Sequence, residues 1–260
     1  MSTRHPRPGA VPFTERTPRV AAARALVRRA GRDKAGRFLV EGAQAVREAL
    51  AFGRVHEIFV TEHAADRHRD LLSTVDVPVS CLTDKAADGL SETVTPQGII
   101  AVCDLLDRHL VDTLADTPRL VTVLVGVSDP GNAGTVTRVS DAAGANAVIF
   151  AGDTVDPHNG KCVRASTGSV FHLPLARSRD TAEVFAACRA AGLRLVAADG
   201  HAPQDLDSVI DNGELAAPTA WVFGSEAHGL DAAVLAEMDS TVKVPLYGAA
   251  ESLNLATAAA

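Results

Sequence analysis

Three short segments of the sequence combine glycine or proline with polar side chains directly after an apolar run. The first is Ser128–Gly134, which Arg138 follows. The second, Gly224–Gly229, contains Glu226, and the third is Pro245–Asn254. Glycine permits a ligand to approach the backbone, and carboxylate, amide, hydroxyl and guanidinium groups can bind or orient a polar substrate. Each segment also has an ordinary explanation, because the same residue types form turns and cap helices.

Turn and helix-start signals predict how these side chains are presented. The Pro-Gly pair at 130–131 fits the centre of a type II turn, after which Asn132 would cap a helix. On that helix Arg138 would point away from the side that faces the core. Ser252 would cap the last helix and place Asn254 in its first turn.

Apolar periodicity predicts that the three segments follow strands of one sheet. The run Leu120–Val127 is apolar throughout, as in a parallel strand covered on both faces. Further strands are predicted at 147–150, 193–198, 220–223 and 241–244, and helices at 136–143, 181–191 and from about 252. Helices between apolar strands require crossover connections, hence a mostly parallel sheet. Ligands bind at the carboxyl edge of such a sheet, so the three segments should meet there.

A second, smaller α/β pattern precedes this one. It begins with an amphipathic helix after Pro18 and ends with the apolar run Ile99–Cys103. Residues 1–16 are rich in proline and arginine, and residues 104–118 are polar and acidic. We therefore predict a disordered tail at 1–16, a small domain at 17–103, a linker at 104–118 and a second domain at 119–260.

The charge of the chain is divided unevenly. The net charge is −7, yet residues 1–40 hold ten lysines and arginines against two acidic residues, which leaves +8 there and −15 elsewhere. Such asymmetry is typical of a basic region that contacts a polyanion, joined to an acidic body. A solvated basic helix with a flexible tail is the alternative that charge alone leaves open.

Several classes of protein are excluded by composition and missing motifs. No apolar run approaches the roughly 20 residues of a membrane helix. The four cysteines form no C-x-x-C pair and the histidines are scattered, so we expect no metal site. The first sixteen residues lack the apolar segment of a signal peptide, which favours the cytoplasm. Dinucleotide, P-loop and G-x-S-x-G signatures are absent from the sequence.

Together, the three segments resemble the motifs of the SpoU (TrmH-type) RNA ribose methyltransferases of the SPOUT superfamily. Residues 129–132 with Arg138 are similar to motif one, 223–226 to motif two, and 244–246 with 251–254 to motif three. The stretch 161–168 resembles the family between motifs one and two. Residues 17–103 resemble the L30e-like substrate-binding domain that often precedes this catalytic domain.

The resemblance implies a fold, a cofactor and a set of site residues. The catalytic domain would be an α/β-knot with a deep trefoil knot that binds S-adenosyl-L-methionine, and the protein would be a homodimer. Cofactor contacts would come from Gly224, Val244, Leu246 and Leu253. The residues around the reacting ribose would be Arg138, Asn132, Glu226, Ser252 and Asn254. RNA contacts would come from Arg24, Arg28, Arg29, Arg32, Lys34 and Arg37, with Arg164 nearer the active site.

The implied reaction is methyl transfer from S-adenosylmethionine to a ribose 2′-hydroxyl, with ribosomal (23S) RNA the favoured substrate. Transfer RNA is the nearest alternative substrate, and a non-catalytic RNA-binding assembly factor is the alternative function. Displacement at a sulfonium requires no metal, and positioning supplies much of the rate. A free guanidinium stays protonated far above neutral pH and is therefore a poor base. We therefore expect Arg138 to bind phosphate and stabilise the developing alkoxide, with the proton acceptor left open.

Overall fold

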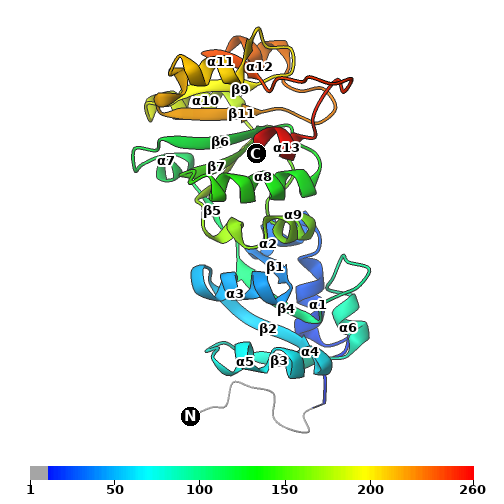
Figure 1. Cartoon of the computed structure of the whole chain (residues 1–260). Coiled ribbons are helices and arrows are strands. Elements are labelled where there is room, and N and C mark those ends of the chain that lie inside the picture. The colour runs from blue at the N-terminus through cyan, green and yellow to red at the C-terminus, as the bar shows by residue number, and fades with distance from the viewer. Residues whose placement is uncertain (1–10) are drawn as a thin grey trace. The chain divides into compact units, whose positions relative to one another are not determined.

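A computed structural model describes residues 11–260 of the chain (Figure 1). The chain divides into two compact units. Unit 1 contains the described residues up to Leu106 together with His158–Phe171, and unit 2 contains Asp107–Pro157 and His172–Ala260. A segment from the middle of the chain therefore packs with the N-terminal unit.

Unit 2 is built on an eight-stranded sheet in the order β10-β12-β9-β11-β6-β7-β8-β5. Every neighbouring pair in this sheet is parallel, which confirms the predicted mostly parallel architecture. The strands are β5 Asp107–Arg108, β6 Leu120–Val125, β7 Ala147–Ala151, β8 Leu175–Ser178, β9 Arg194–Ala198, β10 Gln204–Asp205, β11 Thr219–Phe223 and β12 Ser240–Lys243.

Helices cover both faces of the sheet of unit 2. Val123, Ile149 and Val222 from the strands pack with Phe185 and Leu193 in one buried apolar cluster. Parallel sheets are normally buried on both faces in this way, and the central positions of β6 are buried accordingly. The helices are α7 Leu110–Thr113, α8 Pro130–Ala142, α10 Thr181–Ala190, α11 Leu206–Asp211, α12 Ala232–Ala236 and α13 Leu255–Ala259, with a 3₁₀ turn at Glu214–Ala216.

The strand order of unit 2 is interleaved. The chain adds β7 and β8 on one side of β6, and then builds β9, β11 and β12 on the other side. There β11 lies between β6 and β9, and β12 lies beyond β9. The neighbours β6 and β11 thus mark the point where the order reverses, and the crevice beyond their carboxyl ends is the expected ligand position in an open parallel sheet.

Unit 1 contains a four-stranded sheet in the order β1-β4-β2-β3. Only β2 and β3 are parallel neighbours. The strands are β1 Arg37–Glu41, β2 Val55–Thr61, β3 Val79–Leu82 and β4 Ile99–Asp104. The helices are α1 Pro18–Ala25, α2 Arg29–Ala35, α3 Ala43–Phe52, α4 Glu62–Arg67, α5 Arg69–Ser73, α6 Asp84–Asp88 and α9 Gly160–Ser166, followed by a 3₁₀ turn at Ser169–Phe171.

Part of the predicted disordered tail belongs to unit 1. Residues 1–10 of the predicted disordered tail lie outside the described residues. The amide of Phe13, however, donates to the carbonyl of Cys81 at 2.8 Å, and its carbonyl accepts from the amide of Thr83 at 3.0 Å. The guanidinium of Arg19 lies 5.5 Å from the centre of the Phe13 ring. The prediction of disorder is wrong at Phe13 because this aromatic side chain packs on the core of unit 1.

The stretch 104–118, predicted as a linker, forms secondary structure that belongs to unit 2. Strand β5 pairs with β8, and Leu114 in the turn after α7 is part of the buried cluster of unit 2. Polar composition concealed this contribution, because a two-residue strand and a four-residue helix carry too little periodicity to be recognised. Among residues 11–260, no helix has both the length and the apolar character needed to cross a membrane.

Candidate functional site

The first polar segment forms the beginning of α8. Asp129, not Asn132, is the N-cap, and its carboxylate accepts a hydrogen bond of 2.8 Å from the amide of Asn132. Pro130 is the first helical residue, a position that suits proline because no amide is needed there. The predictions of a type II turn at 130–131 and of a helix capped by Asn132 are therefore wrong, because the helix begins about one turn earlier. The earlier start leaves the side chain of Asn132 available for other contacts.

Glu226 joins the loop after β11 to the loop after β6. One carboxylate oxygen accepts from the amide and the hydroxyl of Ser128, at 3.2 and 3.3 Å. The other accepts from the amide of Asp129 at 3.2 Å and from the side-chain amide of Asn132 at 3.0 Å. A single carboxylate thus receives four donors from a segment almost a hundred residues earlier in the sequence.

The loop that carries Glu226 is closed on itself. Ser225 and Gly229 exchange two backbone hydrogen bonds, of 3.0 and 2.9 Å. Gly229 has a φ of 64°, a conformation that glycine adopts without strain. A Cβ at Gly224 would lie 2.2 Å from the carbonyl carbon of Gly229, so a larger residue cannot occupy that position. The two glycines therefore hold Glu226 at the tip of a tight turn.

Asn254 adds the third segment. Its side-chain amide donates to the side-chain oxygen of Asn132 at 3.1 Å, and its own oxygen accepts from the amide of Ala256 at 2.9 Å. Helix α13 therefore begins at Leu255 and is capped by Asn254, and the prediction that Ser252 caps it is wrong. A hydrogen-bonded chain Asn254–Asn132–Glu226 now joins the three segments.

The direction of each hydrogen bond in this chain is fixed by Glu226. An ionised carboxylate only accepts, so Asn132 must turn its NH₂ group toward Glu226 and its oxygen toward Asn254. Asn254 must in turn present its NH₂ group to Asn132, which leaves its oxygen for the helix. The NH₂ group of each asparagine uses only one of its two N–H bonds among these three residues, so the other can donate to a ligand.

The electrostatics of Glu226 keep it ionised. Burial raises the pKa of Glu226, but the hydrogen bonds from the side chain of Asn132 and from backbone amides, including those of Ser128 and Asp129, outweigh burial. The pKa of Glu226 consequently lies below its usual value. Near neutral pH its carboxylate holds a full negative charge and all four donors.

The other two residues predicted around the ribose are Arg138 and Ser252. Arg138 occupies an exposed position on α8, six residues after Asn132 and about 9 Å farther along the helix axis. Ser252 is exposed in the loop before α13. The structure therefore joins Asn132, Glu226 and Asn254 by hydrogen bonds, and both Arg138 and Ser252 are exposed.

The predicted cofactor residues lie at the same edge of the sheet. Leu246 and Leu253 are 40% and 38% exposed, on the loop between β12 and α13. Within the described part of the chain, the backbone of residues 246–253 forms no hydrogen bond with other protein groups. This loop therefore presents backbone donors, backbone acceptors and apolar side chains together, which suits a ligand that is partly polar and partly apolar.

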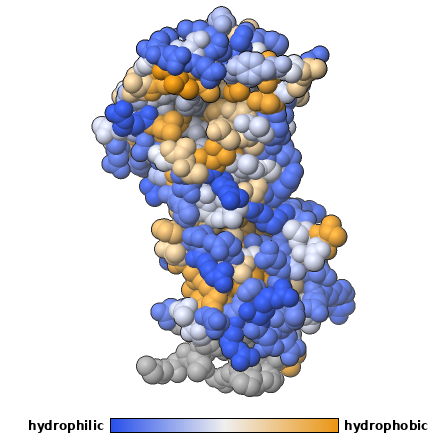
Figure 2. Space-filling model, viewed as in Figure 1, coloured by the Kyte–Doolittle hydropathy of each residue, from blue (hydrophilic) through white to orange (hydrophobic). Residues whose placement is uncertain are grey.

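A mostly apolar cavity of about 230 Å³ lies beside the loop. It is bounded by one face of β6, β11 and β12 and by α8 and α13, with Thr122, Val139, Trp221, Val242, Val244 and Ala259 in its wall. On the face shown in Figure 2, hydrophobic residues gather across the middle of unit 2. Val244 is shared between this cavity and the predicted cofactor set. Among residues 11–260, no group of three His, Cys, Asp or Glu side chains is arranged to hold a metal ion.

Most of the predicted RNA-binding residues are exposed on α1, α2 and β1 of unit 1. Two of them are partly neutralised, since Arg29 lies 3.7 Å from Asp33 and Arg37 lies 3.9 Å from Asp104. Both pairs are solvent-exposed and therefore weak. The exposed members of the set are Arg24, Arg28, Arg29, Lys34 and Arg37.

Arg32 departs from the prediction. The helix predicted from Pro18 breaks near Leu26, and Arg32 is only 3% exposed. Its guanidinium donates to the carbonyls of Leu26 and Val27, at 3.0 and 2.8 Å. Gly31 permits this approach, because a Cβ there would lie 1.9 Å from a carbonyl oxygen of α1. Arg32 thus fixes the helix junction, and its assignment to RNA is wrong.

Arg164 also has a partner inside unit 1. Its guanidinium donates to Glu41 at 3.2 Å from helix α9, and the carboxylate of Glu41 is almost fully buried. The other oxygen of Glu41 accepts from the hydroxyls of Ser91 and Thr93, at 2.8 and 3.1 Å. Sequence reasoning missed Glu41, just as it missed Ser128 and Asp129 as partners of Glu226. No periodic signal marks such pairs, which depend on contacts between distant segments.

The fold is that of an α/β protein, with a candidate ligand site at the reversal point of a parallel sheet. The model of the SpoU rRNA Methylase family matches residues 119–260, and that of the MRM3-like substrate binding domain matches residues 17–101. The chain belongs to the SpoU rRNA methylase family.

Similar proteins match most of the chain. It is 38% identical over 234 residues to the 23S rRNA (guanosine(2553)-2′-O)-methyltransferase RlmP of Bacillus subtilis, with 88% of each chain covered. It is 32% identical over 271 residues to the 23S rRNA (uridine(2479)-2′-O)-methyltransferase of Streptomyces viridochromogenes, which covers 97% of this chain and 90% of that one.

Solved structures that are similar to this chain are also methyltransferases. The SpoU methyltransferase AviRb of Streptomyces viridochromogenes, in complex with AdoMet, superposes with a TM-score of 0.83 at 31% identity over 94% of each chain. An AdoMet-bound rRNA methyltransferase from Sinorhizobium meliloti gives a TM-score of 0.81 at 28% identity over 98% of this chain and 95% of that one.

Proposed function

We propose that the protein transfers a methyl group from S-adenosylmethionine to a ribose 2′-hydroxyl of 23S ribosomal RNA. The observation that carries this proposal is the chain Asn254–Asn132–Glu226, which unites three distant segments beyond the carboxyl ends of β6, β11 and β12. Relatives named as 23S rRNA 2′-O-methyltransferases support the substrate, and AdoMet complexes of similar structures support the cofactor.

The residues at this edge fit S-adenosylmethionine. Leu246 and Leu253 would pack on its apolar parts, and the backbone of residues 246–253 and of Gly224 would bind its polar groups. When bound, the cofactor supplies an electrophilic methyl group on a sulfonium. The protein then has to bind and orient the ribose and exclude water from it.

Glu226 acts in this proposal as a positioning residue. A carboxylate has about four lone-pair sites, and four donors at 3.0–3.3 Å already occupy them. Its pKa below the usual value makes it a still weaker proton acceptor. Glu226 therefore fixes the start of α8 and the orientation of Asn132, and the unused N–H groups of Asn132 and Asn254 donate to ribose oxygens.

Arg138 binds the phosphate next to the reacting ribose in this proposal. It is exposed on α8, and a planar guanidinium can donate two parallel hydrogen bonds to a phosphate. The same positive charge would stabilise an oxyanion that develops on the 2′-oxygen.

The exposed cations of unit 1 hold the rest of the RNA. Charge reversal of Arg24, Arg28, Lys34 and Arg37 should weaken RNA binding and lower the salt dependence of log K by about 3, since each phosphate contact contributes roughly 0.7–0.9 to that slope. Filter binding at several salt concentrations measures both quantities. Arg69→Glu on α5 is the control, and equal losses in the two variants would contradict a localised RNA surface.

A homodimer, a trefoil knot in unit 2 and a cytoplasmic location complete the proposal. The strand order β12-β9-β11-β6, in which β11 lies between two strands that precede it in the sequence, is compatible with the knot. Sedimentation equilibrium tests the dimer, and a monomer at micromolar concentration would contradict it.

Methylation of purified RNA tests the proposed function. The protein, with labelled S-adenosylmethionine, should modify 23S rRNA and leave transfer RNA unlabelled. The modified position should resist alkaline cleavage, and a 2′-deoxynucleotide at that position should abolish labelling. Labelling that persists on the deoxy substrate would show methylation of a base and would refute the proposal.

A further inference from the structure

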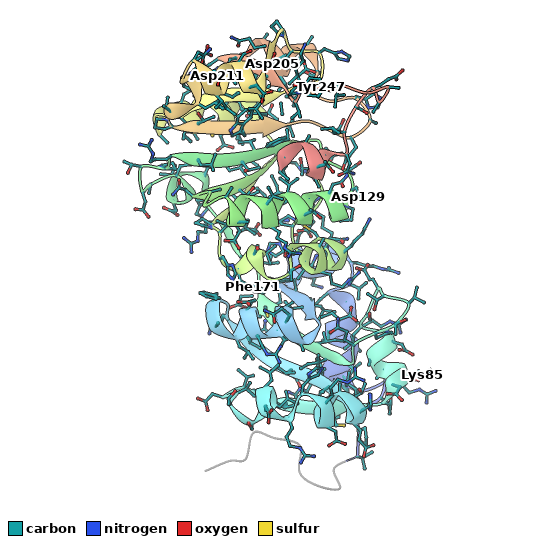
Figure 3. The ribbon with its side chains drawn as sticks, viewed as in Figure 1. Lys85, Asp129, Phe171, Asp205, Asp211 and Tyr247 are labelled. Carbon is teal, nitrogen blue, oxygen red and sulfur yellow. The ribbon has the colours of Figure 1, made fainter. Side chains whose placement is uncertain are left out.

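Tyr247 is an exposed aromatic residue at the candidate site. It is the single tyrosine of the sequence and is 88% exposed. It lies on the loop between β12 and α13, and Figure 3 shows it on the same side of unit 2 as Asp129. In the described part of the chain its ring has no aromatic or cationic partner. The fold therefore gains little from this side chain.

The topology places Tyr247 at the same edge as Glu226. Strands β6, β9, β11 and β12 are parallel, so the loops that follow them leave the sheet at one edge. Tyr247 is four residues beyond the end of β12, and Glu226 is three residues beyond the end of β11. The loop of Tyr247 returns to Asn254, which is hydrogen-bonded to Asn132.

We propose that Tyr247 stacks on a nucleobase of the RNA beside the reacting ribose. The proposal rests on the proposed function, because it assigns a contact for the same substrate. Unpaired bases are recognised by stacking on aromatic side chains, and a base beside a bound ribose must lie within a few ångströms of it. An exposed ring at the edge of the site provides such a platform.

The exposure of the loop favours RNA over the cofactor as the ligand of this ring. Leu246 and Leu253 are 40% and 38% exposed, so the protein covers more of these side chains than of Tyr247, which is 88% exposed. The two leucines can cover a ligand that lies against the sheet edge. The tyrosine reaches outward and meets a ligand that arrives from solvent.

Substitutions at 247 separate stacking from other contributions. Tyr247→Ala should raise the KM for RNA roughly 5- to 100-fold, the loss expected when one stacked base is removed, and leave kcat within about threefold. Tyr247→Phe and Tyr247→Trp should retain the KM of the wild type, whereas Tyr247→Leu should resemble the alanine variant. Ile210→Ala is the control, since Ile210 is 56% exposed on α11 of the same unit.

A binding measurement makes the test independent of catalysis. The probe is a stem–loop oligoribonucleotide of the modified rRNA region, with 2-aminopurine at successive loop positions, whose fluorescence falls on stacking. Wild type, Tyr247→Phe and Tyr247→Trp should quench one position, and Tyr247→Ala should not. Equal quenching by wild type and Tyr247→Ala would overturn the proposal.

Calorimetry with S-adenosylmethionine tests whether Tyr247 stacks on a base of the RNA or on the adenine of the cofactor. Tyr247→Ala should bind the cofactor like the wild type. Weaker cofactor binding together with unchanged RNA binding would overturn the proposal in favour of a ring that covers adenine. A wild type that quenches the probe but methylates no RNA would instead refute the proposed function and leave the stacking contact established.

Discussion

Two glutamates, one in each unit, connect segments that are far apart in the sequence. Glu41 at the end of β1 accepts from Ser91, Thr93 and Arg164. Glu226 accepts from Ser128, Asp129 and Asn132. Both carboxylates bind several donors, yet Glu41 is almost fully buried and faces an arginine, whereas Glu226 is exposed and faces only neutral donors.

This difference separates a structural carboxylate from the one that is proposed to position the catalytic site. Inside unit 1 the charge of Glu41 has to be compensated, because an unpaired buried charge is very unfavourable. At the edge of unit 2, water supports the charge of Glu226, so its hydrogen bonds can be used to orient Asn132 and the start of α8. We therefore expect loss of Glu41 to reduce stability, and loss of Glu226 to reduce turnover.

The largest effect should follow Glu41→Ala. The substitution leaves Arg164 without its carboxylate in a largely buried position, and should lower the free energy of unfolding by about 3 kcal/mol. Urea denaturation measures this change. Asp66→Ala is the matched control, because Asp66 pairs with Arg69 at 3.0 Å on the surface, and such pairs contribute less than about 1 kcal/mol. Similar losses in the two variants would contradict the role of burial.

Glu226→Gln should reduce turnover and leave stability almost unchanged. Glutamine has the same shape but a single acceptor oxygen, so it cannot hold Ser128, Asp129 and Asn132 together. We expect kcat to fall roughly 100-fold, as for displacements of about 1 Å at an active site, with little change in urea midpoint. Glu237→Gln, on an exposed carboxylate after α12, is the control. Normal turnover in Glu226→Gln would show that this carboxylate does not position the site.

Part of this arrangement could be predicted from the sequence. Apolar runs such as Leu120–Val127 indicated a parallel sheet, and its carboxyl edge then brought the three polar segments together. The helix start was harder, because Asp129 and Asn132 are both good caps and the choice depends on Pro130. The inward turn of Arg32 depends on a close approach at Gly31, which no periodicity reveals.

Contacts between distant segments away from the carboxyl edge of the parallel sheet could not be predicted. The segment His158–Phe171 lies within the part of the chain matched by the methylase family, yet it packs in unit 1. Its ion pair between Arg164 and Glu41 spans 123 residues of sequence. Local patterns determine which residues face a core, but they do not determine which element covers that core.

Arg138→Lys examines the exposed arginine that is proposed to bind phosphate. Lysine keeps the charge but loses the planar pair of donors, so turnover should fall roughly tenfold, since one charge-assisted hydrogen bond contributes about 1.5–3 kcal/mol. Steady-state kinetics with 23S rRNA measure the effect, and binding of S-adenosylmethionine should be unchanged. Turnover close to the wild type would refute a requirement for a planar guanidinium.

The smallest effect should be the pH dependence of the Glu226 contribution to stability. Its pKa is lowered in the folded protein from a usual value of about 4.5, so its stabilisation is fully present above that value and is lost as the pH falls through the folded pKa. Because the side chain is exposed, the contribution should be below about 1 kcal/mol. The difference in urea midpoint between wild type and Glu226→Gln should therefore be constant from pH 7 to pH 5 and shrink below pH 4. A difference that grew on acidification would mean that the folded protein favours the protonated carboxyl group of Glu226. The contrast with Glu41 would then fail, because it assumes that Glu226 accepts its hydrogen bonds as an ionised carboxylate.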